Sequence, residues 1–288
     1  GTWEARLEGD WLGVSLNSQR NGVQNNSWFS FPAEELIDIF DHDDVKFDLV
    51  RDAGTLQFEG QVTETGRRPR AEGTFTFVAD PEFAKAMRDL GYKLDDKEQF
   101  GMALYGVRLR DVRLFHELGY NGLAAERLIE FSIHGVTPDY VEDMAGLGYD
   151  ALSPDKLVEY RIHGITPGYV EDLHDAGVRD DDQIVAFRIH GITPEYMEQM
   201  NVILDSTVDA DEAVAMKIHG ITPAYAKHMR ALFPKADPDA LIAARIHGVS
   251  PELVEELHDA GYEDLTLDEV IELRIHGTDK MPLKRRTR

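Results

Sequence analysis

The chain has 288 residues, a formal net charge of −24 and no cysteine. The negative charge argues against general nucleic-acid binding, which depends on a positive surface. The lack of cysteine excludes disulfides, thiolate metal ligands and cysteine nucleophiles. Hydrophobic residues make up 42% of the chain, so we expect a folded protein with a packed core. No apolar run approaches the roughly 18 residues that a membrane-spanning helix requires.

The first 79 residues carry the alternating apolar pattern of β-strands. A turn at Asp52-Ala53-Gly54 is predicted to join two of these segments into a hairpin. We therefore predict a domain over residues 1–79 that is a curled antiparallel sheet or a small, partly open barrel. Its expected strands cover 2–8, 11–16, 27–31, 45–49, 56–58 and 71–78, with one or two helical turns over 32–40, and it contains Trp3, Trp11 and Trp28.

From about Asp80 onward the chain is built of a repeat of about 28 residues. The tripeptide Ile-His-Gly occurs six times at intervals of 27 to 29 residues, and weaker copies upstream bring the number of units to about seven. The repeat region is expected to span residues 80–279, before a basic tail over 280–288. The repeated residues are His134, His163, His190, His219, His247 and His276, followed by Gly135, Gly164, Gly191, Gly220, Gly248 and Gly277.

Each repeat is predicted to contain two short helices. In one unit, Thr166 is a good N-cap, Pro167 suits the first helical position, and Gly177 and Gly191 end the first and second helix. Because glycine and proline interrupt every half-repeat, a continuous coiled coil is excluded. Helices this short must stack on their neighbours to be stable. The sequence thus predicts an α+β protein in which the sheet domain precedes an α-solenoid of about seven helix-pair repeats.

The repeated histidine has two interpretations. A ladder of imidazoles suggests metal binding. However, packed helices lie about 8 to 10 Å apart, so histidines of successive units cannot share one ion at a bond length of about 2 Å. We expect a structural role instead, in which the imidazole in the last helical turn bonds free carbonyl groups and suits the negative end of the helix. No metal ligand and no cofactor is expected.

A basic residue usually stands two positions before each repeated histidine, with Ser132 as the exception. This basic column either forms an anion-binding ridge or pairs with acids of the adjacent unit and with helix-end carbonyls, and we favour the pairing. The isoleucine before each histidine is expected to complete the apolar stripe of the second helix. The basic column consists of Arg161, Arg188, Lys217, Arg245 and Arg274.

The first helix of each unit carries acidic residues on the side opposite its apolar residues. They form either a solvated face or an acidic ridge on which a protein partner docks. A tyrosine just after the proline is expected to pack between repeats. The acidic residues include Glu142, Glu171, Glu198 and Glu255, and the tyrosine column is Tyr140, Tyr169, Tyr196 and Tyr225.

Other charged clusters are less specific. Two acidic clusters do not match the calcium-loop pattern and fit turns and helix N-termini. A basic group falls at a predicted hairpin tip, and a second lies in the tail, which either contacts anionic lipid or an acidic partner or is a solubilising extension. The acidic clusters are Asp41, Asp43 and Asp44 and residues 180–182, and the basic residues include Arg67, Arg68 and Arg70, then Arg285 and Arg286.

The motifs of common catalytic classes are missing. The sequence contains no nucleophile elbow, no His-Glu-x-x-His, no phosphate loop and no dinucleotide fingerprint. We therefore expect a protein that is not an enzyme, with an unfamiliar site around Asp41, His42 and Asp43 as the least favoured alternative.

The segments Arg161-Ile162-His163-Gly164-Ile165-Thr166-Pro167 and Arg188-Ile189-His190-Gly191-Ile192-Thr193-Pro194 resemble a known bacterial repeat. It is the "RIHGVTPEF"-type repeat of exported proteins and of transmembrane metallopeptidases of the β-lactam-sensor (antirepressor) type. The Trp11-Leu12-Gly13 segment and residues 47–60 resemble the β-domain that often precedes these repeats. The resemblance covers most of the chain, supplies no catalytic residue, and implies an extracytoplasmic location with a binding or scaffolding role.

Together these patterns predict a non-catalytic, periplasmic or otherwise extracytoplasmic interaction module. Its expected partners are proteins, such as subunits of a membrane-bound energy-converting or photosynthetic complex, with peripheral membrane contact through the basic tail. The alternative is a small-ligand sensor or carrier in which the three tryptophans of the curled sheet line an apolar pocket.

Overall fold

The computed structural model describes residues 1–8, 10–20, 23–32, 43–64, 69–262 and 264–277. Several predictions lie outside these residues and stay predictions. They concern the helical turns expected over 32–40, of which only Pro32 is described and ends a strand, the cluster of Asp41 and His42, the basic residues Arg67 and Arg68, and the tail with Arg285 and Arg286.

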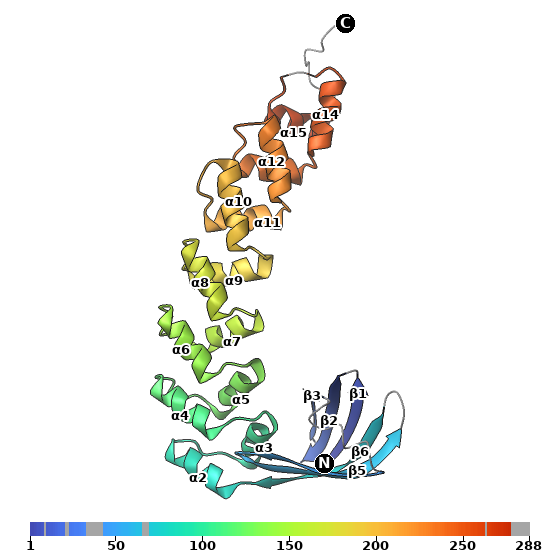
Figure 1. Cartoon of the computed structure of the whole chain (residues 1–288), viewed down its shortest axis with the longest axis vertical. Helices are drawn as coiled ribbons and strands as arrows, with labels where there is room; N and C mark the ends of the chain where they lie inside the picture. The colour runs from blue at the N-terminus through green and yellow to red at the C-terminus, as the bar shows by residue number, and fades with distance from the viewer. Residues whose placement is uncertain (9, 21–22, 33–42, 65–68, 263, 278–288) are drawn as a thin grey trace. The chain divides into compact units, whose positions relative to one another are not determined.

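Six antiparallel strands form one open sheet with the strand order β3-β2-β1-β6-β5-β4 (Figure 1). Since β3 and β4 are the two edges and do not pair with each other, the sheet is open rather than closed into a barrel. The strands are β1 (Thr2–Glu8), β2 (Trp11–Arg20), β3 (Val23–Pro32), β4 (Asp44–Arg51), β5 (Gly54–Glu64) and β6 (Arg70–Ala79). Each strand that the sequence predicted is present, and Asp52-Ala53 forms the turn of the β4–β5 hairpin.

Trp3 stands at the centre of the buried face of the sheet. Its side chain is 1% exposed, contacts Phe47 and Phe58 edge-on, and donates from Nε1 to the carbonyls of Glu59 and Thr74 at 3.2 and 3.1 Å. A buried indole N–H without a partner would be costly, so these bonds fix the ring in place.

Fourteen helices follow the sheet in the described chain, in seven pairs, and the predicted α+β architecture is confirmed. The first helices of the pairs are α2 (Pro81–Asp89), α4 (Leu109–Glu117), α6 (Pro138–Gly146), α8 (Pro167–Asp175), α10 (Pro194–Leu204), α12 (Pro223–Leu232) and α14 (Pro251–Asp259). The second helices are α3 (Asp96–Leu104), α5 (Ala125–His134), α7 (Pro154–Ile162), α9 (Asp181–His190), α11 (Ala210–Ile218), α13 (Pro238–Ile246) and α15 (Leu267–His276).

The predicted capping residues begin and end these helices. Thr166, Thr193 and Thr222 each accept a backbone N–H of the first helical turn, and proline follows each of them. The glycine of Ile-His-Gly takes a positive φ, as at Gly191 with 63°, a conformation that glycine adopts without the steric cost of a Cβ atom.

The chain divides into two compact units, residues 1–142 and 143–288. The boundary predicted at residue 79 coincides with the end of β6 at Ala79, but the sheet and the first helix pairs belong to one unit. Gln99 of α3 shows why, because its buried amide donates to the carbonyls of Ala53 and Asp80 at 2.9 and 2.7 Å. This amide ties the hairpin turn and the end of β6 to the first helix pair.

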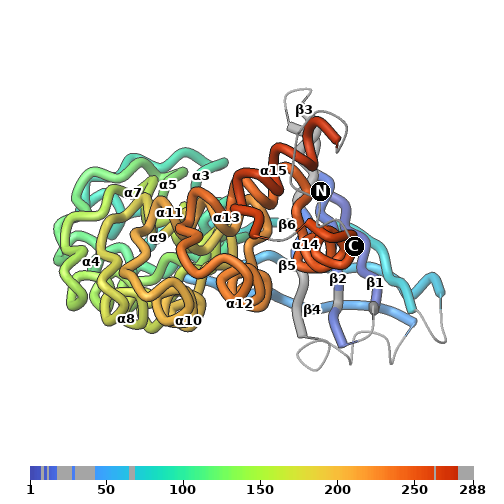
Figure 2. Tube along the Cα trace, turned by 90° about the horizontal axis from the view of Figure 1, so that it is seen from above, coloured from blue at the N-terminus to red at the C-terminus, as the bar shows by residue number. Residues whose placement is uncertain are grey.

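In the second unit the helices form two layers. First helices pack on first helices, α10 on α12 and α12 on α14, while second helices pack on second helices, α9 on α11, α11 on α13 and α13 on α15. Seen from above, α8, α10 and α12 run along one side of this unit and α9, α11 and α13 along the other (Figure 2). This alternation is the stacking expected of a solenoid.

A tyrosine and a basic residue form a repeated contact that we call the tyrosine–base clamp. Its members are the pairs Tyr169 and Arg188, Tyr196 and Lys217, and Tyr225 and Arg245, with the cationic group 4.5 to 5.1 Å from the ring centre. Each tyrosine hydroxyl donates to the carbonyl that follows the glycine of its own repeat: Ile192, Ile221 or Val249, at 3.0 to 3.2 Å.

The clamp of Tyr169 and Arg188 also joins successive repeats. Arg188 Nε donates to the carbonyl of His163, at the end of the preceding second helix, at 3.0 Å. Its guanidinium also lies 3.4 Å from the position that a Cβ atom would take on Gly164. Arg188 therefore satisfies a helix-end carbonyl of the preceding repeat and makes a cation–π contact in its own repeat. Burial raises the pKa of Tyr196 to about 12, so its hydroxyl stays protonated and donates at neutral pH.

We predict that Tyr196→Phe lowers the free energy of unfolding by about 1 to 2 kcal/mol, because it leaves the carbonyl of Ile221 without its donor. Urea denaturation measures the change. Tyr105→Phe is the matched control, since the Tyr105 hydroxyl has no hydrogen-bond partner in the described chain, and equal losses in the two variants would contradict the prediction.

Candidate functional site

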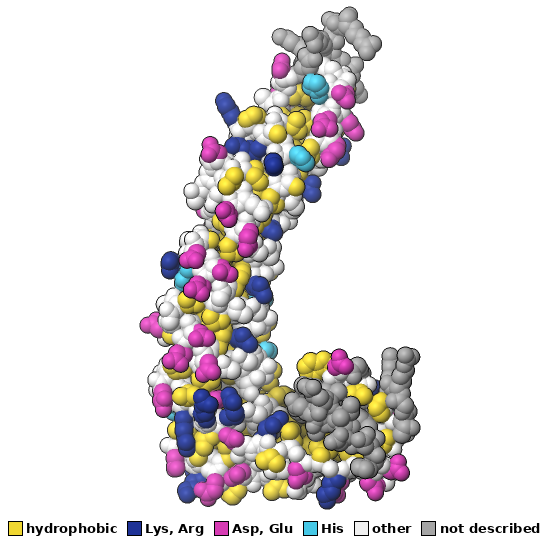
Figure 3. All heavy atoms as spheres, viewed as in Figure 1, with side chains coloured by type: hydrophobic (Ala, Val, Ile, Leu, Met, Phe, Trp, Pro, Cys, Tyr) yellow, Lys and Arg dark blue, Asp and Glu magenta, His cyan; other side chains and the backbone are white. Residues whose placement is uncertain are grey.

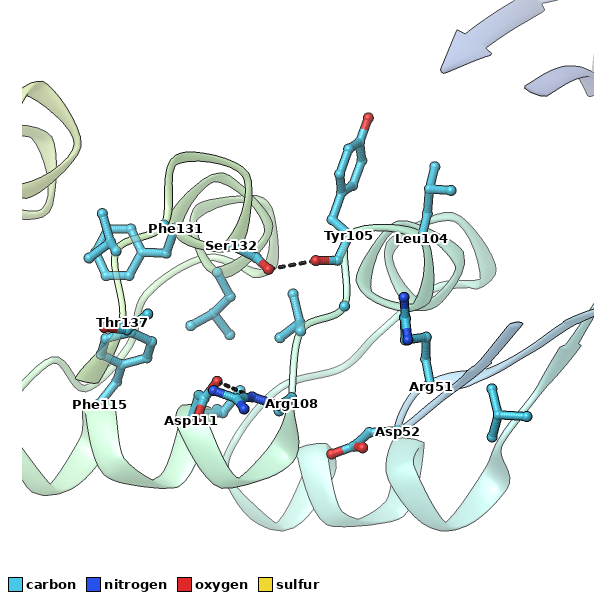
Figure 4. A pocket seen from close by; sticks show the side chains of 17 residues that line it. Arg51, Asp52, Leu104, Tyr105, Arg108, Asp111, Phe115, Phe131, Ser132 and Thr137 are labelled. Atoms are coloured by element: carbon cyan, nitrogen blue, oxygen red, sulfur yellow. Dashed lines mark hydrogen bonds and ion pairs between the residues drawn. The ribbon is translucent and has the colours of Figure 1, made fainter. Parts of the chain in front are cut away.

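A cavity of about 500 Å³ lies in the first unit, where the β4–β5 hairpin meets the first helix pairs (Figure 4). Arg51 and Asp52 border it from the hairpin, and the end of α5 borders it through Ser132. Arg108 and Asp111 border it at the start of α4. Its remaining wall is largely apolar and includes Val50, Leu104, Val112, Phe115, Phe131 and Val136.

Asp52 caps a helix that lacks its own capping side chain. In the later repeats a threonine or serine precedes the first helix, but Arg108 stands at this position before α4 and makes no side-chain capping bond. The Asp52 carboxylate accepts the backbone N–H of Leu109 at 2.9 Å. The β4–β5 hairpin therefore supplies the capping acceptor that this repeat lacks, from a residue far away in the sequence.

Arg51 takes the place of the basic residue that this repeat lacks. Its Nε lies 3.8 Å from the Cβ position on Gly106, whereas in the second unit the basic column places Arg245 Nε 3.9 Å from the same position on Gly220. The basic column has no cation at this repeat because Ser132 replaces it, and Ser132 Oγ donates to the carbonyl of Tyr105. The hairpin arginine thus lies over the glycine where a repeat arginine normally lies.

The tyrosine of the clamp is also replaced at this repeat. Asp111 stands 29 residues before Tyr140, at the tyrosine position, and its carboxylate pairs with Arg108 Nε at 2.7 Å (Figure 4). This pairing raises the pKa of Arg108 above its ordinary value. Because a short carboxylate replaces the phenol ring at this repeat while Arg51 takes the place of the repeat arginine, the space that the ring would fill is left as the cavity.

The repeated histidines lie at helix ends as predicted, but the expected bonds from their imidazoles to carbonyls are not made at the four central positions. His163, His190, His219 and His247 have no side-chain hydrogen bond within the described chain, and His276 faces Glu272 at 3.3 Å. The helix-end carbonyl of His163 instead accepts a hydrogen bond from Arg188 of the next repeat. The prediction of imidazole capping is therefore wrong at those four positions.

The expectation that the isoleucine before histidine completes the buried stripe is wrong. These isoleucines are 45 to 58% exposed. In α9, Ile184 is fully buried, and Ile189 lies five residues later, about 140° around the helix, which points it away from the packed side. We call the exposed set in the second unit the isoleucine column: Ile162, Ile189, Ile218, Ile246 and Ile275.

The charged columns have different surroundings. The predicted contact of the basic column with helix-end carbonyls is confirmed at Arg188, while the predicted carboxylate partners are not found for Arg188, Arg245 or Arg274 among the described residues. The acidic residues Glu142, Glu171, Glu198 and Glu255 are exposed, as a solvated face requires. Acidic side chains are spread over the visible face of the second unit (Figure 3).

The remaining candidates have structural surroundings. Asp180 caps α9, and Asp182 pairs with Lys156 of α7 at 2.8 Å, in agreement with the predicted role in helix N-termini. Arg70 pairs with Glu64 across β5 and β6. Asp43 is exposed.

The three tryptophans do not share one face of the sheet. Trp3 pairs with Leu16 on the buried face, while Trp28 pairs with Ser15 and shares the other face with Trp11. Trp11 and Trp28 are 55 and 66% exposed, so the pocket expected from all three is not formed.

No group of three or more metal-ligating side chains occurs among the residues that the structure describes. None of the described helices has the length and apolar character needed to cross a membrane. Comparisons of the sequence with models of known protein families and with individual curated proteins give no match.

We predict that Asp52→Ala lowers the free energy of unfolding by about 1 kcal/mol, since α4 loses its capping acceptor. Amide hydrogen exchange should accelerate mainly in the first turn of α4. Asp48→Ala, an exposed position on β4 of the same hairpin, is the control, and unchanged exchange in α4 of Asp52→Ala would contradict the capping role.

Proposed function

We propose that the protein is a non-catalytic, extracytoplasmic scaffold whose second unit binds protein partners along the isoleucine column. The observation that carries this proposal is an exposed isoleucine at the same position of each successive repeat in that unit. Single exposed apolar residues are ordinary on protein surfaces, but a regular series of them presents one extended apolar line.

Burial of this column supplies a substantial binding energy. Each isoleucine is about half exposed, and covering that half contributes about 1 kcal/mol by the usual relation between apolar area and free energy. Several adjacent repeats that act together therefore favour an extended partner surface over a small ligand, as in other solenoids.

The charge of the chain adds a preference among partners. With a net charge of −24 and exposed acidic residues on the first helices, the scaffold attracts partners with basic surfaces and repels acidic ones. The resemblance of the repeats to those of exported proteins supports an extracytoplasmic location, and an accessory role in a membrane-bound complex fits this setting. Fractionation of native cells tests the location.

The column is tested by replacing two of its central members, in the variant Ile189→Glu with Ile218→Glu. The partner that co-purifies with the wild-type chain from native membranes should bind the variant at least tenfold more weakly, because charged groups would be buried against it. A photo-cross-linking residue at position 218 should react with the same partner.

The control variant carries Glu171→Lys with Glu255→Lys, on the exposed side of the first helices. Its affinity for the partner should stay within a few-fold of the wild-type value, while the salt dependence of binding should change. Recovery of the wild-type chain only as a free monomer, or equal binding by the isoleucine variant, would refute the proposed surface.

A further inference from the structure

The cavity of the first unit occupies the place of a missing tyrosine–base clamp. In three repeats of the second unit, a phenol ring lies beneath a cation and its hydroxyl donates to the carbonyl after the glycine. At α4 the ring is absent because Asp111 stands in its position, but the groups that would contact a ring are present.

The first of these groups is the cation. Arg51 lies over Gly106 as the repeat arginines lie over the glycine of the preceding repeat, and its guanidinium has no hydrogen bond, ion pair or ring contact within the described chain. It lines the cavity. A guanidinium above an open apolar space is suited to the face of an aromatic ring.

The second group is the hydrogen-bond acceptor. Val136 follows Gly135 as Ile192 follows Gly191, so its carbonyl is the counterpart of the one that accepts from Tyr169. Val136 is 3% exposed and lines the cavity, and its carbonyl accepts no hydrogen bond from any described residue. A carbonyl that has no donor from the chain and belongs to a residue lining the cavity can accept a hydrogen bond from a hydroxyl placed there.

The third feature is the wall between these groups. Leu128, Phe115 and Phe131 present apolar surface, and Asp111 is held to one side by its pair with Arg108. The volume of about 500 Å³ lies in the range of sites for small ligands. The cavity thus combines an apolar wall, a cation at its edge and a carbonyl without a donor, and the carboxylates of Asp52 and Asp111 also border it.

We propose that this cavity binds a para-substituted phenol, with the ring beneath Arg51 and the hydroxyl donating to the carbonyl of Val136. Two sources share this chemistry, a free phenolic compound and the tyrosine side chain of a polypeptide. The phenol replaces in the first unit the ring that tyrosine supplies in the later repeats.

The test uses p-cresol and the full chain. Titration followed by NMR should give saturable shifts of the amide signals of Gly135 and Val136. Toluene, which lacks the hydroxyl, should bind at least about threefold more weakly, as the loss of one hydrogen bond predicts. Absence of saturable shifts at these residues, or equal affinity for toluene, would overturn the proposal.

The substitution Asp111→Tyr places a tyrosine ring of the chain itself in the cavity, at the position that tyrosine occupies in the later repeats. This variant should bind p-cresol at least tenfold more weakly and should melt at a higher temperature than the wild-type protein. Arg110→Tyr is the matched control, because position 110 is exposed and a tyrosine there leaves the cavity free. Undiminished binding by folded Asp111→Tyr would place the ligand elsewhere.

A second variant decides the matter if Asp111→Tyr does not fold. Arg51→Met keeps the length of an exposed side chain and removes its charge, so p-cresol affinity should fall about two- to fivefold. An unchanged affinity would show that Arg51 does not contact the ligand and would contradict the proposal.

N-acetyl-L-tyrosinamide distinguishes the two sources of the phenol. If it binds at least as tightly as p-cresol, the mouth of the cavity admits a polypeptide backbone and the natural ligand is a tyrosine of a partner. If p-cresol binds and the amide does not, the natural ligand is a free phenol. This measurement requires no protein partner, so it is independent of the fate of the isoleucine column.

Discussion

Helices of nine to eleven residues cannot bury their apolar sides alone, and this constraint governs the helical part of the molecule. Each repeat must present both an apolar face and satisfied helix ends to its neighbours. The clamp meets both needs, because Arg188 reaches the carbonyl of His163 in the preceding repeat while it covers the ring of Tyr169 in its own. Stability therefore resides in the junctions between repeats more than in any one helix.

At the second helix pair, α4 and α5, the sheet supplies contacts that the later repeats make with their own residues. Asp52 acts in place of a capping threonine, and Arg51 acts in place of a repeat arginine. The Gln99 amide also donates to this turn, at the carbonyl of Ala53. The hairpin tip thus ends the array in the way that a terminal capping repeat does in other solenoids, although it is built from β-structure.

Local signals in the sequence were sufficient for much of the fold. Proline after threonine, glycine after histidine and strict alternation before residue 79 predicted the helices and strands because each acts within a few neighbouring residues. The burial of Ile189 was predicted wrongly, because Ile189 lies about 140° around α9 from the buried Ile184 and so points away from the packed side. The sequence showed the tyrosine column and the basic column of the clamp. It did not show that the two columns contact each other, because that contact depends on how the helices pack.

The cavity was beyond prediction from the sequence for a different reason. Ser132 was recognisable as an exception, and Asp111 departs from the tyrosine column. Nothing local, however, indicates that Arg51 and Asp52, more than 50 residues earlier, lie at the same junction. Convergence of this kind depends on how the hairpin packs on α3 and α4, which is a tertiary contact.

The hairpin's contribution to the first helix pairs has a consequence for anyone who divides the chain for expression. A cut after Ala79, where the last strand ends, would leave α4 without the Asp52 acceptor and Gln99 facing water through the gap left by Ala53. A fragment that starts after residue 142 severs neither of these bonds, although it divides α6 (Pro138–Gly146). The end of the last strand and the boundary between the two compact units thus lie at different points along the polypeptide.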